Sequence, residues 1–384
     1  MGVTQFTADS PGELVPLADG DAAFVPARLP PNWQFANELW PLLAEVKHLF
    51  GVLEGIGRVL PNPGLLLRPM EDREAIRSSK LEGTFVTPTE LLLFDMEPLE
   101  PTSETDPVNS QREVFNYRRA LHEAVNSPLP ISLRLICDMH RTLLTGVRGQ
   151  DRSPGRFRQV QVFLGSSKRF IPTPPFRLAE CLDLFEKGLH QPVPFDPIVE
   201  SFIAHYQFET IHPFVDGNGR IGRLLLALMI FQRCGFSKPW LYMSAFFERY
   251  RDEYVDRLFK VSSQGDWNGW IEFCLRGAAY QAKDTIDRCE RLLKFRADFI
   301  TRIDQSGGSV RLHQIVDGLF RSPFLRITDM ARQLEVTYPT AKADIDRLAN
   351  LGILHDLPNV SPKTFYSLDL FNLAYEDLEV STAT

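Results

Sequence analysis

The sequence predicts a mainly α-helical protein with a smaller C-terminal domain of different character. In several segments, among them residues 39–46, apolar side chains recur at the i, i+3, i+4, i+7 spacing of a helix. Alternation of the β type is confined to a short stretch at 160–164. The sequence Gln-Ser-Gly-Gly at 305–308 separates the long helical part from a last segment with shorter elements. A chain of 384 residues is expected to form two or three domains.

The composition excludes several classes of protein. With a net charge of −7, the surface as a whole does not attract nucleic-acid backbones. The longest apolar run, Leu224–Phe231, is far shorter than the about 20 residues that span a bilayer, and the first residues carry no leader pattern. The five cysteines are scattered without a Cys-x-x-Cys pair, which predicts reduced thiols and no zinc site. We therefore expect a cytoplasmic protein with no membrane partner.

The N-terminal part divides into an arm and a helical region. Residues 1–32 are rich in proline, glycine and aspartate, and we expect a poorly ordered arm there. Residues 33–110 form the predicted helical region, in which a helix over 71–82 ends at Gly83, a residue type favoured just past a helix end. The connection that follows is rich in proline and acidic residues, and only Leu91–Asp95 is expected to be helical within it.

Residues 111–304 make up the predicted core domain. Helices are expected from residue 111 and over 132–144, and Asp196-Pro197 starts a further helix because aspartate caps the first turn and proline fits its first position. The stretch 146–175 is punctuated by proline and glycine, and its alternating residues predict a β-hairpin.

Residues 305–384 are predicted to form a winged helix-turn-helix domain. Helices are expected over 310–320, 328–334 and 338–351, followed by a two-stranded wing. Over residues 309–372, basic and acidic side chains are equally numerous, which is unfavourable for a domain that must neutralise several phosphates. DNA binding is therefore not favoured over a protein contact, including contact with a second copy of the chain in a homodimer.

The segment 212–223, between two predicted helices, carries the groups of a catalytic site. A proline follows His212 and prevents it from continuing the preceding helix, so the imidazole lies in a loop. Imidazole titrates near neutrality and can take a proton from an attacking group. The sequence Gly217-Asn218-Gly219 allows consecutive N–H groups to turn inward at the start of the next helix, where anions bind.

Charged side chains complete this segment. Arg220 and Arg223 stand three residues apart on the first turn of the following helix, so both guanidinium groups can reach one anion. Asp216 offers a hard oxygen ligand that suits Mg²⁺. An anion cradle, two cations, a metal ligand and a base together predict phosphoryl or nucleotidyl transfer. The Gly-x-Gly-x-x-Gly spacing in the same place does not indicate a dinucleotide fold, because a helix and not a strand precedes it.

The segment 212–223 resembles the signature of the Fic (Fic/DOC) family, His-Pro-Phe-x-(Asp/Glu)-Gly-Asn-Gly-Arg-x-x-Arg, and every specified position is filled. Ser78 and Glu82 are similar to the inhibitory motif, (Ser/Thr)-x-x-x-Glu-(Gly/Asn), of family members that carry this helix before the core. The stretch 146–175 resembles the loop and hairpin of the family, and its hairpin, residues 159–171, is called the flap below. A C-terminal winged helix is a common companion of the family.

The resemblance implies a Fic-type helical core and protein adenylyl transfer (AMPylation), in which a Tyr, Thr or Ser hydroxyl of a target protein attacks the α-phosphate of ATP. By position, His212 would deprotonate the hydroxyl, and Asp216 would hold Mg²⁺ against the phosphates. Asn218 and the backbone around Gly217 and Gly219 would cradle the α-phosphate.

The resemblance also implies how the triphosphate is bound and how its binding is inhibited. Arg220 and Arg223 would bind the β- and γ-phosphates. Glu82 would pair with Arg223 and block the γ-phosphate, and Ser78, one helical turn earlier, would support that helix by hydrogen bonding. The target protein would meet the flap, and modification of the chain by itself stays open.

The helix after the core departs from the family. Many members carry Asn-Arg and a Tyr-Tyr pair there, which contact or support the nucleoside, whereas this chain has Tyr250 in place of the asparagine and Val255 in place of the second tyrosine. Tyr250 is therefore a candidate nucleotide contact in a pocket whose base preference the sequence does not fix. Two alternative functions also follow: removal of AMP with Glu82 positioning a water, and a nucleotide-sensing regulator that binds DNA.

Overall fold

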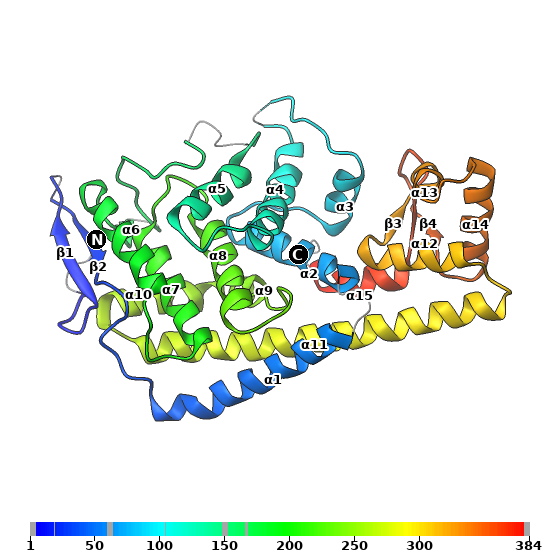
Figure 1. The fold of residues 1–384 in the computed structure, drawn as a ribbon. Helices are drawn as coiled ribbons and strands as arrows, with labels where there is room; N and C mark the ends of the chain where they lie inside the picture. Colours follow the sequence, from blue (N-terminus) through cyan, green and yellow to red (C-terminus); the bar gives the residue numbers. More distant parts are fainter. Residues whose placement is uncertain are drawn as a thin grey trace.

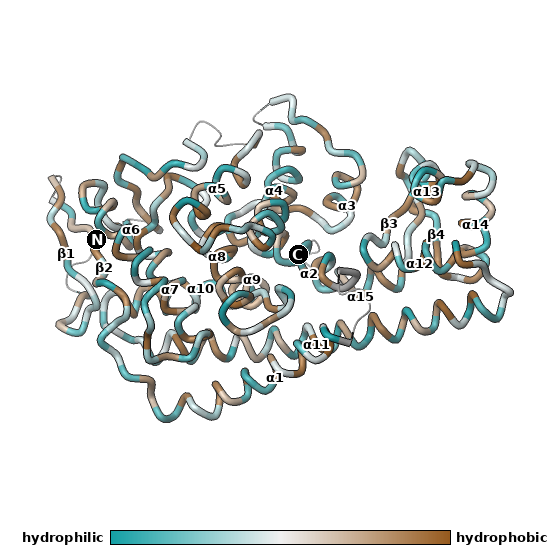
Figure 2. Tube along the Cα trace, viewed as in Figure 1, coloured by the Kyte–Doolittle hydropathy of each residue, from teal (hydrophilic) through white to brown (hydrophobic). Residues whose placement is uncertain are grey.

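The computed structural model describes residues 5–18, 20–59, 64–103, 105–147, 153–165 and 168–379. It is mainly α-helical, as predicted, with a helical body at one end and a smaller unit at the other (Figure 1). The long helix α11 (Trp267–Gln305) runs along both. Apolar and polar residues alternate along α1 and α11, which is typical of helices with one buried face (Figure 2). Within the described part of the chain, none of the helices combines the length and apolar character needed to cross a membrane.

The N-terminal arm contains a β-hairpin. Strands β1 (Gly12–Pro16) and β2 (Ala22–Pro26) pair antiparallel. Phe24 is fully buried, and its N–H donates to the carbonyl of Ile171 over 2.8 Å. The expectation of a poorly ordered arm over 1–32 is therefore wrong for this hairpin. Composition alone misses it because the surface that covers its apolar side chains comes from the core domain.

The N-terminal helical region packs around α2. Its elements are η2 (Asn37–Leu39), α1 (Trp40–Val59), α2 (Gly64–Leu81), α3 (Pro88–Met96) and α4 (Val108–Val125). Helix α2 begins earlier than the predicted helix over 71–82 but ends as expected, with Gly83 at a φ of +85° just beyond it. Only glycine adopts this left-handed conformation without steric cost, which is why the helix ends here.

The core domain is built around α7 and α8, two helices that are buried on most sides. The bounds are α5 (Leu133–Leu144), α6 (Pro175–His190), α7 (Pro197–Ile211), α8 (Asn218–Arg233), α9 (Ser244–Arg249) and α10 (Arg251–Gln264). Helix α7 starts as the sequence predicted, because the side chain of Asp196 accepts a hydrogen bond from the N–H of Ile198. Almost every residue of α7 and α8 is buried, so the loop between them is fixed at both ends by the core.

The flap is held by a single antiparallel bridge among its described residues. Leu164 and Phe170 exchange backbone hydrogen bonds of 2.9 and 3.1 Å, and the predicted turn at 166–167 lies outside the described residues. The prediction of a two-stranded hairpin is thus wrong in extent. Backbone groups on either side of the bridge bond elsewhere: the carbonyl of Val160 accepts from Arg158, and that of Ile171 accepts from β2.

The C-terminal unit contains four helices and a small sheet. Its elements are α12 (Val310–Arg321), β3 (Phe324–Leu325), α13 (Ile327–Gln333), α14 (Tyr338–Asn350), β4 (His355–Asp356), β5 (Phe365–Tyr366) and α15 (Leu368–Glu379). The strands form an antiparallel sheet in the order β3-β5-β4. Three helices followed by a wing match the predicted order of elements, whereas the assignment as a winged helix-turn-helix and the domain boundaries stay predictions. The sequence analysis does not predict α15.

Helix α15 returns from the C-terminal unit and docks on α2 and α11 (Figure 1). The carboxylate of Asp377 accepts hydrogen bonds from Arg73 and Arg77 of α2, each over 3.0 Å to Oδ2, and from Arg288 of α11 over 3.2 Å to Oδ1. Burial alone would raise the pKa of Asp377, but these three arginines hold it well below its usual value. An ionic cluster therefore joins α15 to α2 of the N-terminal helical region and to α11.

We expect Asp377→Asn to destabilise the protein. Hydrogen bonds to charged groups contribute about 1.5–3 kcal/mol each, and because the carboxylate is 36% exposed we expect a total loss of about 2 kcal/mol. A depressed carboxyl pKa contributes stability above the unfolded value of about 3.9 and loses it as the pH falls. Urea unfolding should therefore show a difference at pH 7 that shrinks below about pH 4.

Asp298→Asn serves as the matched control, because its ion pair with Arg302 over 2.6 Å lies on an exposed face of α11. An exposed pair of this kind should contribute less than about 0.5 kcal/mol. Equal effects of the two substitutions would contradict a structural role of the cluster around Asp377.

Candidate functional site

The loop between α7 and α8 places the imidazole of His212 at the end of a buried helix. His212 adopts a left-handed conformation, with φ 52° and ψ 62°, and its N–H still donates to the carbonyl of Phe208 over 3.0 Å. The side chain of Asn218 closes the loop by two hydrogen bonds to the backbone of Phe214. Its oxygen accepts from the Phe214 N–H over 2.8 Å, and its nitrogen donates to the Phe214 carbonyl over 2.9 Å. The loop therefore has one fixed shape.

The imidazole of His212 is oriented as a base. Its Nδ1 lies 3.3 Å from the carbonyl oxygen of Glu209, which can only accept, so Nδ1 carries the hydrogen and Nε2 keeps its lone pair. Burial lowers the pKa of His212 to about 4, and the charge of Arg158 acts in the same direction. The hydrogen bond to Glu209 and the charges of Glu82 and Asp216 act against this shift. The ring is therefore neutral at pH 7.

Arg223, on the second turn of α8, is held by the end of α2. Its Nε donates to the hydroxyl of Ser78 over 2.9 Å, and its Nη2 donates to the Ser78 carbonyl and to Oε1 of Glu82, each over 2.8 Å. Burial alone would raise the pKa of Glu82, but the charge of Arg223 keeps it below its usual value. The carboxylate of Glu82 is thus paired with Arg223, the cation that the sequence analysis predicts to bind an anionic ligand.

Arg220 has acidic partners other than the one that pairs with Arg223. Its Nη1 lies 3.2 Å from Oε2 of Glu113 on α4, and its Nη2 lies 3.6 Å from Oδ1 of Asp216. Oδ1 of Asp216 also accepts from the N–H of Gly217 over 2.6 Å. Each of the two arginines is thus paired with a glutamate that is distant in sequence, Arg220 with Glu113 and Arg223 with Glu82. That both guanidinium groups aim at one anion stays a prediction.

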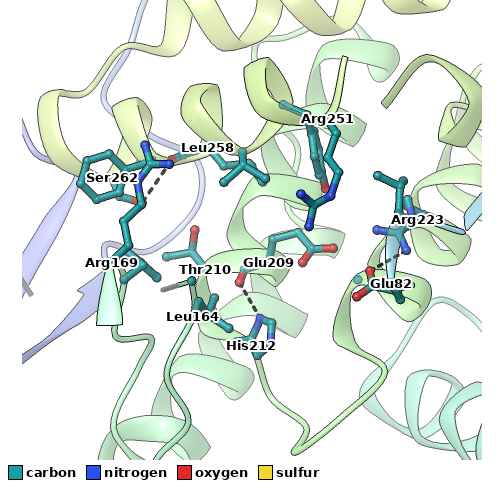
Figure 3. A pocket seen from close by; sticks show the side chains of 17 residues that line it. Glu82, Leu164, Arg169, Glu209, Thr210, His212, Arg223, Arg251, Leu258 and Ser262 are labelled. Carbon is teal, nitrogen blue, oxygen red and sulfur yellow. Dashed lines mark hydrogen bonds and ion pairs between the residues drawn. The ribbon is translucent and has the colours of Figure 1, made fainter. Parts of the chain in front are cut away.

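A cavity of about 360 Å³ joins these groups (Figure 3). His212 and the Glu82–Arg223 pair face it from different elements. Gly219, at the start of α8, also lines the cavity. Its far wall is formed by residues of the flap and of α10, both apolar and polar: Leu164, Gly165, Arg169, Phe170, Arg251, Tyr254, Val255, Leu258, Phe259 and Ser262. Tyr250 does not line this cavity, because its ring packs against Phe246 and Arg249.

Three residues of the site are missed by sequence reasoning. Glu209 lines the cavity, its Oε1 is buried without a hydrogen-bond partner, and burial raises its pKa to about 7. His140 accepts at Nδ1 from the N–H of Gly155 over 2.8 Å and donates from Nε2 to the carbonyl of Asp216 over 3.0 Å. Arg158 is buried beside His212. No local pattern marks them, because each acts through partners far away in sequence.

Taken together, the site places a neutral imidazole, a glycine-bounded helix N-terminus and a buried guanidinium around one cavity. Backbone N–H groups and a cation at a helix start bind anions such as phosphate. An imidazole a short way off can take a proton from a group that attacks the bound ligand. Fold and site thus define a helical protein with a cavity at the N-terminus of α8 whose lining groups suit an anionic ligand.

Comparison with known proteins shows similarity to one family. Residues 130–230 match the sequence model of the Fic/DOC family, and residues 40–126 match the model of the Fic/DOC family N-terminal region. Residues 40–126 run from α1 to α4, and residues 130–230 run from α5 to α8. The range 130–230 contains the loop of His212. Two consecutive stretches of the chain are therefore similar to the Fic/DOC family.

Curated relatives are similar over the same part of the chain. Protein adenylyltransferase fic-1 of Caenorhabditis elegans is 38% identical over 172 residues, which cover 44% of this chain and 31% of that protein. Protein adenylyltransferase Fic of Aedes aegypti is 32% identical over 145 residues, which cover 37% of this chain and 27% of that protein. The aligned part thus spans about three-tenths of the length of these relatives.

Solved structures share the fold. A Fic family protein from Desulfovibrio desulfuricans G20 superposes with a TM-score of 0.56 at 19% identity, covering 87% of this chain and 97% of that one. Fic-1 of C. elegans superposes with a TM-score of 0.53 at 23% identity, covering 66% of this chain and 75% of that one. The Fic-type core predicted from the sequence is therefore confirmed.

We expect His140→Phe to weaken the loop that carries Asp216. Phenylalanine keeps the stacking on Phe214, whose ring centroid lies 3.8 Å away, but removes the acceptor of the Gly155 N–H and the donor to the Asp216 carbonyl. Each unpaired buried group costs about 1–3 kcal/mol, so urea unfolding at pH 7.5 should show a loss in this range or above it.

The same variant should show a weaker pH dependence of stability. Burial lowers the pKa of His140 to about 4, so the unfolded chain binds a proton more readily, and stability falls as the pH drops from about 6.5 to 4. Removing this histidine should reduce the slope by up to about 1.4 kcal/mol per pH unit. His190→Gln, at an exposed position, should leave the slope unchanged; an unchanged slope in His140→Phe would contradict a neutral buried ring.

Proposed function

We propose that the protein is an autoinhibited adenylyltransferase that transfers AMP from ATP to a hydroxyl of a target protein. The observation that carries this proposal is the cavity that His212 shares with Arg223, whose guanidinium is paired with Glu82. The names of the relatives support the adenylyl-transfer reaction and a protein target. The choice of a Tyr, Thr or Ser hydroxyl and modification of the chain by itself are part of the same proposal.

The proposed reaction uses the geometry as follows. Nε2 of His212 removes the proton of the target hydroxyl, whose oxygen forms a bond to the α-phosphorus while the bond to the pyrophosphate oxygen breaks. The backbone at Gly217 and Gly219 would face the α-phosphate. Arg223, once released from Glu82, would neutralise the charge of the leaving pyrophosphate. Asn218 contributes indirectly, because both ends of its amide are bonded within the loop.

A magnesium ion fits this site only together with the phosphates. Asp216 has a carboxylate beside the N-terminus of α8, but no cluster of three or more potential ligand side chains occurs among the described residues. Mg²⁺ commonly binds through one or two carboxylates plus substrate phosphates. Asp216 would therefore hold the ion against ATP, where Mg²⁺ supplies charge neutralisation.

The proposed inhibition is electrostatic. The carboxylate of Glu82 occupies Nη2 of Arg223 and would repel the γ-phosphate at short distance. The 39% exposed side chain lies at the end of α2, so it can leave the pair without unfolding the core. Release of Glu82 would therefore give the triphosphate its cation.

We expect Glu82→Gly to raise adenylyl transfer about 10²–10³-fold, because it restores one preorganised cation to the ligand. His212→Ala in the same background should abolish transfer without a change in the melting temperature. Incorporation of label from α-³²P-ATP into the protein and into lysate proteins measures both effects.

Glu123→Gln, an exposed acid on α4, is the control and should behave as wild type. If Glu82→Gly were no faster than the wild type, the autoinhibition would be refuted. If labelling persisted in His212→Ala, a different group would have to act as the base.

The target protein is proposed to align along the flap. Val160 and Phe163 are 56% and 42% exposed there, so an extended segment can pair with the backbone beside them. Val162→Pro removes one N–H donor at this edge and should lower kcat/KM for the target protein by about tenfold while KM for ATP stays within about twofold. Equal loss for both substrates would contradict docking at the flap.

Of the two alternatives, AMP removal is favoured by one observation. Glu82 and His212 line the same cavity, so the carboxylate could orient a water toward a phosphodiester. A time course that starts from AMPylated target separates the two directions. DNA binding gains no support from α14, since Lys342 pairs with Asp346 over 2.7 Å and Asp344 pairs with Arg311 over 2.8 Å.

A further inference from the structure

Arg158 is a buried arginine between the flap and the end of α7, with no described acid as its partner. It is 4% exposed, and no carboxylate in the described ranges lies within ion-pair distance of its guanidinium. Burial lowers the pKa of Arg158 to about 10, so the group still carries its charge at pH 7. A buried charge without a counterion is costly, and proteins keep one only where its hydrogen bonds are fully used.

The guanidinium is bonded to carbonyl groups of two segments. Nε donates to the carbonyl of His212 over 2.8 Å, and Nη2 donates to that of Ile211 over 3.3 Å. Nη1 donates to the carbonyl of Val160 over 3.0 Å, and Nη2 also donates to that of Thr173. The same side chain therefore holds the end of α7 and both ends of the flap.

These bonds lie where the backbone is strained. His212 has a positive φ, and a left-handed conformation costs a residue with a β-carbon about 1–3 kcal/mol. Besides the bond from Arg158 to the His212 carbonyl, the backbone N–H of Arg158 donates to the carbonyl of Pro213 over 2.9 Å. Two consecutive carbonyl groups after α7 are thus fixed by one residue, which stabilises the conformation that turns the imidazole toward the cavity.

We propose that Arg158 is a positioning residue that fixes the His212 imidazole and the flap in one rigid arrangement. This inference rests on the proposed function, because the flap is where the target hydroxyl is expected. A hydroxyl held along the flap then meets Nε2 of His212 at a distance set by four hydrogen bonds of one guanidinium. Positioning of this kind is what proximity catalysis requires.

The charge of Arg158 acts on the same imidazole. Charged groups face His212 from three sides: Arg158 from the segment before the flap, Glu82 from α2 and Asp216 from its own loop. The cavity also contains Arg169 of the flap, Glu209 of α7, Arg223 of α8 and Arg251 of α10. The charge of Arg158 lowers the pKa of His212, whereas those of Glu82 and Asp216 raise it, so removing Arg158 should raise that pKa.

Two substitutions separate the geometry from the charge. Arg158→Lys keeps the cation but cannot span four carbonyl groups, whereas Arg158→Gln removes the cation and most of the bonds. Arg156→Gln, two residues away at an exposed position, is the matched control. Two measurements apply to each variant: kcat and the KM values for ATP and target in the Glu82→Gly background, and the NMR titration of the His212 ring, assigned with His212→Asn.

We expect Arg158→Lys to keep the His212 pKa near that of the wild type but to lower kcat about tenfold or more, with KM for ATP within about twofold. Arg158→Gln should raise the pKa by about one unit or more, and Arg156→Gln should change neither quantity. If Arg158→Gln does not fold, Arg158→Lys alone decides: a normal melting temperature with reduced kcat supports the proposal, and wild-type kcat overturns it.

The NMR titration does not depend on catalysis, so it separates two kinds of failure. If Glu82→Gly transfers no AMP, the proposed function fails while the His212 titration still tests the influence of Arg158. If transfer occurs but folded Arg158→Gln titrates and reacts as the wild type does, the role of Arg158 is refuted and the proposed function stands.

Discussion

The buried guanidinium of Arg223 is the group on which the site depends. Its side chain is only 3% exposed, and the acceptors that satisfy it come from the last turn of α2. Because a buried cation without a partner costs several kcal/mol, α8 and α2 form a single electrostatic unit. The carboxylate of Glu82 is bonded to Nη2 of this cation. Under the proposed function, an anionic ligand and Glu82 compete for the same guanidinium.

The position of α2 is set by polar bonds as well as by apolar packing. Glu74 accepts from the hydroxyl of Tyr117 over 2.9 Å and from that of Ser244 over 2.6 Å. On the same helix Asp72 accepts from Arg118 over 2.6 Å and from the hydroxyl of Tyr375 over 2.9 Å. These donors come from α4, α9 and α15, and such directional bonds fix the rotation of a helix more closely than apolar contacts do. This is how a single acid at its end meets Arg223.

Local signals in the sequence predicted much of the fold. Asp196-Pro197 and Gly83 mark helix ends because caps and left-handed glycines act within one turn, and the structure places helix ends there. The flap and the N-terminal arm were harder, because their backbone groups bond to each other's segments, as Phe24 does with Ile171. Alternating apolar and polar residues indicate that a segment favours the strand conformation, but they do not show which other segment will pair with it.

The sequence by itself determined the chemistry within the segment 212–223: a base, a glycine-bounded helix start and two cations, all close because they lie within a few turns of one another. Only the tertiary structure decided which of the two cations lines the cavity, which is Arg223. Arg220 and Arg223 are equivalent by spacing, but Glu113 of α4 binds one and Glu82 of α2 binds the other. The partners of a buried charge come from distant parts of the chain, so they exist only once the helices have packed.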